Sequence, residues 1–237
     1  MLGVSSGLIS AAMGGIGAVS ASAIATAAFS NLKHKYVSRG TAAKLCYCLI
    51  AADGIITEDE KAGFREIAES FGCESDDEWS GAAREIEEIY KSGNLKTISS
   101  QIEEYASYIL SAPGRGQGQI NPYLLIWNMM TLAICDQDFA PSEKQLINTV
   151  AEGLGIAQGV VMAMDEKLNT LYALQAEEQK LKQAEKSFKN VEVMQQELEQ
   201  KKDDILANVT LFIDKIYKSE DDQLKKSQLL GDFCQAK

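Results

Sequence analysis

The chain is poor in the residues that most often build enzyme active sites and metal centres. It has one histidine, His34, and no Cys-x-x-C pair, whereas a structural zinc site takes four cysteine or histidine ligands, usually in close pairs. It also lacks a G-x-S-x-G motif, a phosphate-binding loop and a dinucleotide fingerprint, so we expect no enzyme. The cysteines form no framework, which is typical of reduced thiols in a cytoplasmic compartment. They are Cys46, Cys48, Cys73, Cys135 and Cys234.

Proline, β-forming runs and positive charge are also scarce. With three prolines and long stretches of Ala, Leu, Glu, Lys and Gln, the composition favours helices. Runs of alternating Val, Thr and Tyr are rare, which leaves little from which to build a sheet. The net charge of −11 argues against nucleic acid as a partner, since an acidic surface repels phosphates. Hydrophobic residues make up 46% of the chain, enough for a buried core, so the sequence predicts an all-α fold.

The first 32 residues carry no charged side chain. A helix that spans a bilayer needs about 20 mainly apolar residues, so segment 1–32 is long enough, although Gly, Ala and Ser dilute it. Small residues at four-residue spacing favour close helix packing in lipid. We expect an apolar helix that is anchored in a membrane by its larger side chains, among them Leu8, Ile9, Ile16, Val19 and Ile24.

A basic linker, residues 33–40, follows the apolar segment. Basic residues flank the cytoplasmic side of membrane helices, so we expect the rest of the chain in the cytoplasm, at a bacterial inner membrane. Two alternatives stay open. The segment could pack with copies of itself in a cytoplasmic oligomer, or it could be a secretory signal, although the basic start of such signals is missing.

Two stretches of the chain repeat each other without a gap, 83 residues apart. They are residues 49–72 and 132–155. Similar apolar residues recur in both at helical spacing, which predicts one buried stripe in each copy. The identical pairs are Leu49/Leu132, Asp53/Asp136, Glu60/Glu143, Lys61/Lys144, Ala68/Ala151, Glu69/Glu152 and Gly72/Gly155. The repeat therefore predicts two units, each made of a helix, an acidic turn and a second helix.

Helix-start and helix-end chemistry explains several of the repeated residues. Thr57 and Glu60 have the spacing of a capping box, in which each side chain bonds the backbone amide of the other residue. In the second copy, Pro141 suits the first position of a helix and Glu143 the third. A glycine ends each unit, as a left-handed residue after a helix requires.

The stretch AADGIITEDE, followed by an apolar helix that ends in Phe-Gly, resembles the TerB-like domain of the tellurite-resistance family. The A-D-G-x-x-x-x-x-E turn of that family occurs twice, and the resemblance covers residues 41–156. In the second copy Gln137 replaces the glycine and Cys135 the alanine. The layout is also similar to that of DjlA-type membrane co-chaperones, but Lys35 follows the single histidine where their J domain has a proline. The resemblance implies a helical bundle and a role in stress or envelope response, without a J domain.

Acidic side chains gather at both turns, and two interpretations of them stay open. Carboxylates suit Ca²⁺ or Mg²⁺, and TerB-like domains are often suspected of binding metal. Helix capping explains several of the same residues without an ion, and the turns are too short for an EF-hand loop. The candidate ligands are Asp53, Glu58, Asp59 and Glu60 in the first turn, and Asp136, Asp138 and Glu143 in the second.

Residues 157–218 predict a long helix, because neither Pro nor Gly interrupts them after Gly159. Apolar residues at heptad spacing form a seam that is typical of a coiled coil, with Gln195 and Lys202 as polar interruptions. The seam consists of Leu174, Leu181, Ala184, Phe188, Val191, Leu198 and Ile205. It could meet a protein partner, a second copy, or residues 206–218 folded back on it. Residues 219–237 are expected to be a frayed or weakly docked tail.

These features together predict a non-enzymatic adaptor or scaffold. The TerB-like domain and the long helix would present acidic and apolar faces to protein partners at the membrane. The alternatives are a cytoplasmic module that responds to a divalent cation, and an oligomeric assembly component whose N-terminal helices form a bundle.

Overall fold

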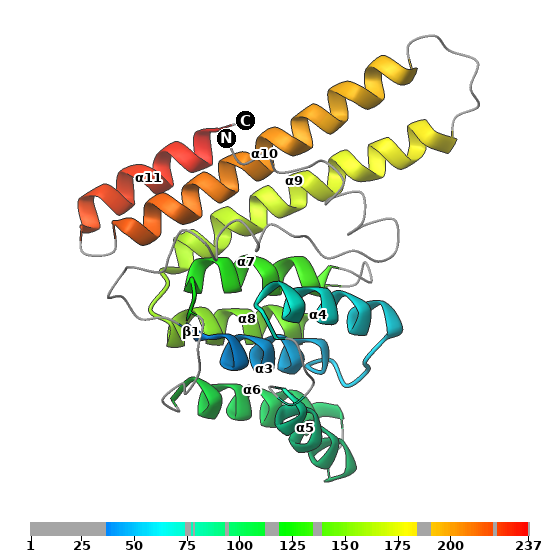
Figure 1. Cartoon of the computed structure of the whole chain (residues 1–237), viewed down its shortest axis with the longest axis vertical. Helices are drawn as coiled ribbons and strands as arrows, with labels where there is room; N and C mark the ends of the chain where they lie inside the picture. The colour runs from blue at the N-terminus through cyan, green and yellow to red at the C-terminus, as the bar shows by residue number, and fades with distance from the viewer. Residues whose placement is uncertain are drawn as a thin grey trace.

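The computed structural model shows the expected all-α fold (Figure 1). It describes residues 37–73, 77, 79–92, 95–111, 119–134, 139–183, 191–219 and 222–236. The predicted N-terminal helix, with Leu8, Ile9, Ile16, Val19 and Ile24, lies outside these residues. Among the helices that the structure describes, none has the length and apolar character to cross a bilayer.

Two helix–turn–helix units form the centre of the molecule, as the repeat predicts. The first consists of α3 (Arg39–Ile50) and α4 (Glu58–Ser70), and the second of α7 (Pro122–Ala133) and α8 (Pro141–Gly153). Each unit begins with a side-chain cap. The hydroxyl of Ser38 accepts a hydrogen bond from the amide of Thr41 (3.1 Å), and the side-chain oxygen of Asn121 accepts one from the amide of Tyr123 (2.9 Å).

A short β ladder joins the starts of the two units. Strand β1 (Val37–Ser38) pairs antiparallel with β2 (Gln119–Ile120), and Val37 lies opposite Ile120. These two residues are 83 positions apart, so each pairs with its own equivalent in the other copy. Such self-pairing is what an approximate two-fold axis produces. The repeat therefore begins earlier than its sequence identity reveals, and the two units are related by local two-fold symmetry.

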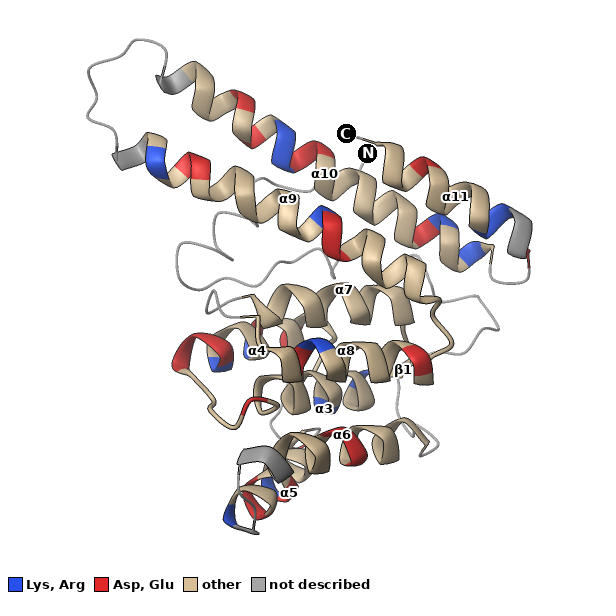
Figure 2. Ribbon diagram, turned by 180° about the vertical axis from the view of Figure 1, so that it is seen from behind, with Lys and Arg blue, Asp and Glu red and all other residues tan. Residues whose placement is uncertain are grey.

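Helix α7 lies at the centre of the core. All 12 of its residues are buried, and Figure 2 shows that none of them is charged. A helix that is apolar on every side has to be covered on every side. It packs against α3, α4 and α8, and also against α9 (Gln158–Gln183) and α10 (Val191–Lys218). The repeated units and the C-terminal helices therefore share one core.

Helices α5 (Ser80–Ser92) and α6 (Leu95–Ser111) cover the opposite side of the body (Figure 1). Both pack on α3, and α6 also packs on α8. The carboxylate of Glu103 in α6 accepts hydrogen bonds from Gln145 (2.7 Å) and Thr149 (2.5 Å) of α8. These hydrogen bonds hold α6 on the second unit, while its packing on α3 links it to the first.

The C-terminal region is a hairpin rather than one long helix. Helix α9 ends at Gln183, and α10 begins at Val191 and runs back along it (Figure 1). The chain therefore does not fold back at residues 206–218, which continue α10. The seam packs inside the molecule: Leu198 and Ile205 are buried, and Leu174 and Leu181 are half-buried. Ala184 and Phe188 lie outside the described residues, and Val191 is placed only by the backbone of α10.

Lys202, expected as a polar interruption of the seam, is fully buried in the hairpin. Its Nζ donates to Oε2 of Glu178 on α9 (2.5 Å) and to Oε2 of Glu199 (2.6 Å). Burial lowers the pKa of Lys202, but the hydrogen bonds to the two carboxylates outweigh it, so the pKa is raised and the lysine stays charged. A buried ion pair adds little net stability, but it can fix one register between two helices.

The last residues are not a frayed tail, because residues 223–235 form a docked helix, α11 (Gln223–Gln235). The ring of Phe233 stacks on that of Phe212 in α10, with centroids 4.0 Å apart and planes 9° apart. Lys167 of α9 lies 5.3 Å from the centre of the Phe233 ring and donates to the carbonyl of Ala236. An aromatic anchor and a cation at the helix end thus hold α11 on the bundle.

Candidate functional site

The first acidic turn is built by Asp53 and Gly54. A carboxylate oxygen of Asp53 accepts a hydrogen bond from the amide of Ile55 (2.8 Å), which closes an Asx turn. Gly54 has a φ of 91°, a conformation that a side chain would strain. The two residues turn the chain from the end of α3 toward the start of α4.

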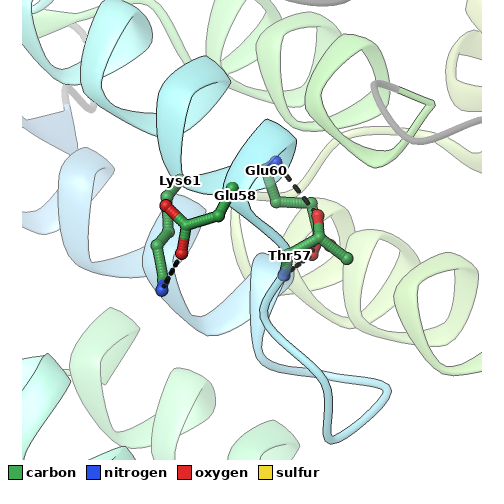
Figure 3. Close-up of polar contacts among 4 residues, drawn as sticks. All are labelled: Thr57, Glu58, Glu60 and Lys61. Carbon is green, nitrogen blue, oxygen red and sulfur yellow. Dashed lines mark hydrogen bonds and ion pairs between the residues drawn. The ribbon is translucent and has the colours of Figure 1, made fainter.

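The capping box predicted from Thr57 and Glu60 is present (Figure 3). The Thr57 hydroxyl accepts from the Glu60 amide (3.2 Å), while Oε2 of Glu60 accepts from the Thr57 amide (2.7 Å) and hydroxyl (2.8 Å). Glu60 is 4% exposed. This carboxylate therefore completes the start of α4, where backbone amides would otherwise lack acceptors.

The two other acidic residues at the start of α4 point into solvent. Glu58 forms an exposed ion pair with Lys61 (2.7 Å; Figure 3). Asp59 is also exposed. The hydrogen bond from Lys61 lowers the pKa of the Glu58 carboxyl. An exposed pair of this kind contributes little to stability, but both acids lie at the positive end of the helix dipole.

The second turn keeps one half of the capping box. The amide of Ala140 donates to Oε2 of Glu143 (2.8 Å), but alanine has no side-chain oxygen with which to return a bond. Pro141 occupies the first helical turn, as predicted. Glu143 is 3% exposed, as deeply buried as its equivalent in the first unit. Asp136 and Asp138 lie outside the described residues.

Among the described residues, no three Asp, Glu, Cys or His side chains come together as metal ligands. Glu60 and Glu143 are each bonded to a backbone amide at a helix start. Part of the second turn lies outside the described residues, so binding of Ca²⁺ or Mg²⁺ stays a prediction. Calorimetric titration of the full chain with each ion would test it.

Both units end in the same way. Gly72 and Gly155 have φ values of 80° and 73°, and each donates its amide to a carbonyl three residues earlier (2.8 and 2.9 Å). The next residue, Cys73 or Ile156, donates to a carbonyl five residues earlier (3.0 and 2.9 Å). These are the bonds of a Schellman motif, so the predicted role of the two glycines is confirmed.

Three of the thiols are deeply buried. They belong to Cys46, Cys48 and Cys73. Burial raises the pKa of Cys46 far above its usual range and that of Cys48 to about 12. Thiols of this kind stay protonated and behave as small apolar side chains, not as nucleophiles.

An aromatic cluster, which the sequence pattern did not point to, closes the first unit. Tyr47 of α3, Phe64 of α4 and Trp79 just before α5 pack together. The ring of Trp79 stacks on Tyr47 with centroids 5.3 Å apart, and it meets Phe64 edge-on at 4.9 Å. Tyr47 and Phe64 are themselves edge-on at 5.2 Å. Trp79 thus occupies a socket whose walls come from α3 and α4.

The second unit has a small open pocket between α8 and α9. It has a volume of about 130 Å³. Its floor is formed by buried apolar side chains, and its rim by polar side chains and by Met162, which is 64% exposed. The lining residues are Met130, Phe139, Lys144, Ile147, Asn148, Gln158, Val161, Met162 and Asp165.

The fold and the turns define an all-α domain built from two symmetry-related helix–turn–helix units, in each of which a buried glutamate, Glu60 or Glu143, accepts a backbone amide at a helix start. The family model described as tellurite resistance protein TerB matches residues 39–166. The match spans more than half of the chain, and the chain belongs to this family. It extends beyond the predicted end at residue 156, into α9, and so includes the whole pocket. No curated protein and no solved structure matches the chain.

Proposed function

We propose that this TerB-family protein is a non-enzymatic adaptor, tethered to the bacterial inner membrane by residues 1–32, with its helical body in the cytoplasm. Stress or envelope response is the setting that its family resemblance suggests. The body would hold partner proteins close to the membrane surface.

The observation that carries the adaptor proposal is the projecting α9–α10 hairpin. Its far half extends beyond the other described helices (Figure 1). Near the start of α10, the side chains of Val193 and Met194 are 53% and 43% exposed. Exposed apolar side chains on a projecting element are suited to burial against another protein. Both helices of the hairpin also pack on the buried helix α7, which joins the hairpin to the body.

The chemistry of the turns and thiols favours binding over catalysis. Glu60 and Glu143 are engaged in helix capping, and the buried thiols have raised pKa values. A catalytic site needs an activated nucleophile, a positioned acid or base, or an open metal position. Side chains that complete helices are poor candidates for these roles.

The sequence around the start of the body supports the tether. Residues 1–32 are uncharged and the next few are basic, which suits a helix whose C-terminal end faces the cytoplasm. Val37, at the start of the body, is buried in the β ladder. A short basic linker would therefore hold the body against the surface of the membrane.

Carbonate extraction of membranes tests the tether. We expect the full chain to stay in the pellet and a chain that begins at Lys33 to move to the supernatant. Full-length protein in the supernatant would contradict a membrane anchor.

A pull-down from native membranes tests the adaptor role. We expect a specific set of proteins with the natural chain, and a reduced set when Val193→Asp and Met194→Asp are combined. Ile55→Asp is the matched control, because Ile55 is also exposed (63%) but lies in the first acidic turn. Equal recovery from all three proteins would exclude the hairpin as the docking element.

A further inference from the structure

The internal repeat supplies a direct comparison for the pocket between α8 and α9. Two of its walls, Met130 and Ile147, are 83 positions after Tyr47 and Phe64, the walls of the socket that holds Trp79. Its lysine, Lys144, is the equivalent of Lys61. The pocket is therefore the second copy of the Trp79 socket.

The two sockets differ in what fills them. In the first unit the indole of Trp79 packs against both walls. The residue 83 positions after it is Met162, which is 64% exposed and lies at the rim. The second socket thus has the equivalent walls, with methionine at the position of Trp79 and Phe139 as the one aromatic residue among the described residues that line it.

The size of the open socket suits one aromatic ring. Its volume is about 130 Å³, and an engineered apolar cavity of ~150 Å³ binds benzene. The walls Met130, Ile147 and Val161 are at most 6% exposed, and the equivalent wall Phe64 of the filled socket is 2% exposed. A guest ring therefore reaches these walls only when a side chain at the rim, such as the 64% exposed Met162, moves aside. Two methionines among the lining residues favour an aromatic guest, because thioether sulfur makes favourable contacts with rings and adapts its shape.

The rim carries one charge of each sign, Lys144 on α8 and Asp165 on α9. The ammonium of Lys144 lies 4.6 Å from the centre of the Phe139 ring. In the first unit the equivalent lysine pairs with Glu58 (2.7 Å), a position that Pro141 occupies in the second. A rim with one positive and one negative side chain does not favour a lipid surface or a nucleic acid. A peptide suits it better, because the carbonyl groups beside a docked ring can accept a hydrogen bond from the lysine and the amide groups can donate one to the aspartate.

We propose that this socket docks an aromatic side chain, tryptophan by comparison with Trp79, from a partner polypeptide. The inference deepens the adaptor proposal and rests on it for its biological meaning. Binding of a ligand in the socket is measured separately from capture of partner proteins. The socket proposal and the adaptor proposal can therefore fail independently of each other.

The test uses the full chain with ¹³C-labelled methionine methyl groups and two short capped peptides, acetyl-Gly-Trp-Gly-amide and acetyl-Gly-Ala-Gly-amide. We expect the tryptophan peptide to shift the Met130 and Met162 methyl signals saturably, with a dissociation constant on the order of 1 mM for so small a ligand. Met194, exposed on the hairpin, should not shift, and the alanine peptide should shift none. Absence of shifts at Met130 and Met162 would overturn the proposal.

A plugged variant sharpens the test. Met162→Trp restores the residue of the first unit and should abolish the peptide-induced shift at Met130. It should also raise the melting temperature, because the indole fills an open apolar site. Met194→Trp adds the same indole away from the socket and should leave binding unchanged. If Met162→Trp does not fold, as judged by circular dichroism, Met162→Phe replaces it. A Met130 shift that persists in the folded plugged variant would show that the peptide binds elsewhere.

Partner capture separates this inference from the adaptor proposal. Partners that bind the natural chain and are lost with Met162→Trp support both. Peptide binding without any captured partner leaves the socket standing and contradicts the adaptor role. Partners retained equally by Met162→Trp support an adaptor and exclude the socket as its docking site. If dimers of this chain dissociate in Met162→Trp, the occupant is a second copy, which overturns the assignment to a partner polypeptide.

Discussion

Thr57 and Ala140 occupy the same position in the two units, yet only one of them can cap its helix with a side chain. The Thr57 hydroxyl accepts from the amide of Glu60, and the corresponding bond is missing at Ala140. The two helix starts therefore allow a helix with a full capping box to be compared, within one molecule, with a helix that has half of one. The effects of substitutions at Thr57 and Ala140 on stability can be compared directly, because the glutamates that bond their amides are almost equally buried.

Exchanging these two residues should change stability in opposite directions. We expect Thr57→Ala to lower the free energy of unfolding by about 1 kcal/mol, and Ala140→Thr to raise it by roughly 0.5–1 kcal/mol, since a cap is gained without loss of another bond. Urea denaturation followed by circular dichroism measures both. A destabilising Ala140→Thr would show that the second turn cannot accommodate the side chain.

The buried thiol of Cys48 makes the stability of the fold sensitive to alkaline pH, because its pKa is raised by burial. The pKa of Cys48 rises from its ordinary value of 9.0 to about 12 in the folded state. A group with a raised folded pKa contributes stability below its unfolded pKa, and this contribution is lost as the pH rises toward the folded pKa. We therefore expect the free energy of unfolding to fall between pH 9 and about pH 12.

Replacing the thiol should reduce this pH dependence. Cys48→Ala removes a group that loses its proton only in the unfolded chain, so its stability should fall less steeply above pH 9. Cys234→Ala is the matched control because Cys234 is exposed. Urea unfolding at several pH values gives the slopes. Identical slopes for the natural chain and Cys48→Ala would contradict a thiol contribution.

Among the elements, the α9–α10 hairpin contains a fully buried ammonium group, that of Lys202. Lys202 bonds two glutamates, of which the side chain of Glu178 is 9% exposed and that of Glu199 is 31% exposed. Removing the lysine takes the ammonium group away from the buried Glu178 carboxylate. Removing both charges leaves an apolar contact of similar volume.

The losses of stability caused by replacing Lys202 and Glu178 are therefore expected to be non-additive. We expect Lys202→Met to lower the free energy of unfolding by about 3 kcal/mol, and the double variant Lys202→Met with Glu178→Met to recover most of that loss. A double-mutant cycle in urea measures the coupling. Additive losses would show that the two side chains do not depend on each other in the folded state.

The turns and the hairpin also show what local sequence can predict. The capping residues and the helix-ending glycines follow from local chemistry, and the structure contains both. The break before α10 was missed, because residues 157–218 keep an uninterrupted apolar periodicity that suits one long helix as well as two. The open socket was missed for another reason. It depends on Trp79 and Met162 being equivalent, which becomes evident only when the contacts of the first unit are known.

Across the whole molecule, the repeat predicts the two units but not their junction with the C-terminal helices. Helix α7 is apolar on every side, yet the sequence does not say which elements cover it. The structure shows α3, α4 and α8 packed against it together with α9 and α10. The core of the repeated units is therefore shared with the C-terminal helices, even though the sequence identity of the repeat ends at Gly155.

A truncated chain tests this dependence. Removing residues 157–237 would expose the part of α7 that α9 and α10 cover, and it would also remove the apolar side chains of α9 that pack on it. Burial of apolar area stabilises by about 25 cal/mol per Å², and domains are stable by only ~5–15 kcal/mol. We expect the truncated chain to aggregate or to lose fixed tertiary structure, whereas the intact body unfolds in one transition followed alike by circular dichroism and tryptophan fluorescence. Trp127 lies in α7 of the second unit and Trp79 in the socket of the first, so the fluorescence reports on both repeated units. A monomeric, cooperatively folded fragment that ends at residue 156 would show that α7 does not need the C-terminal helices.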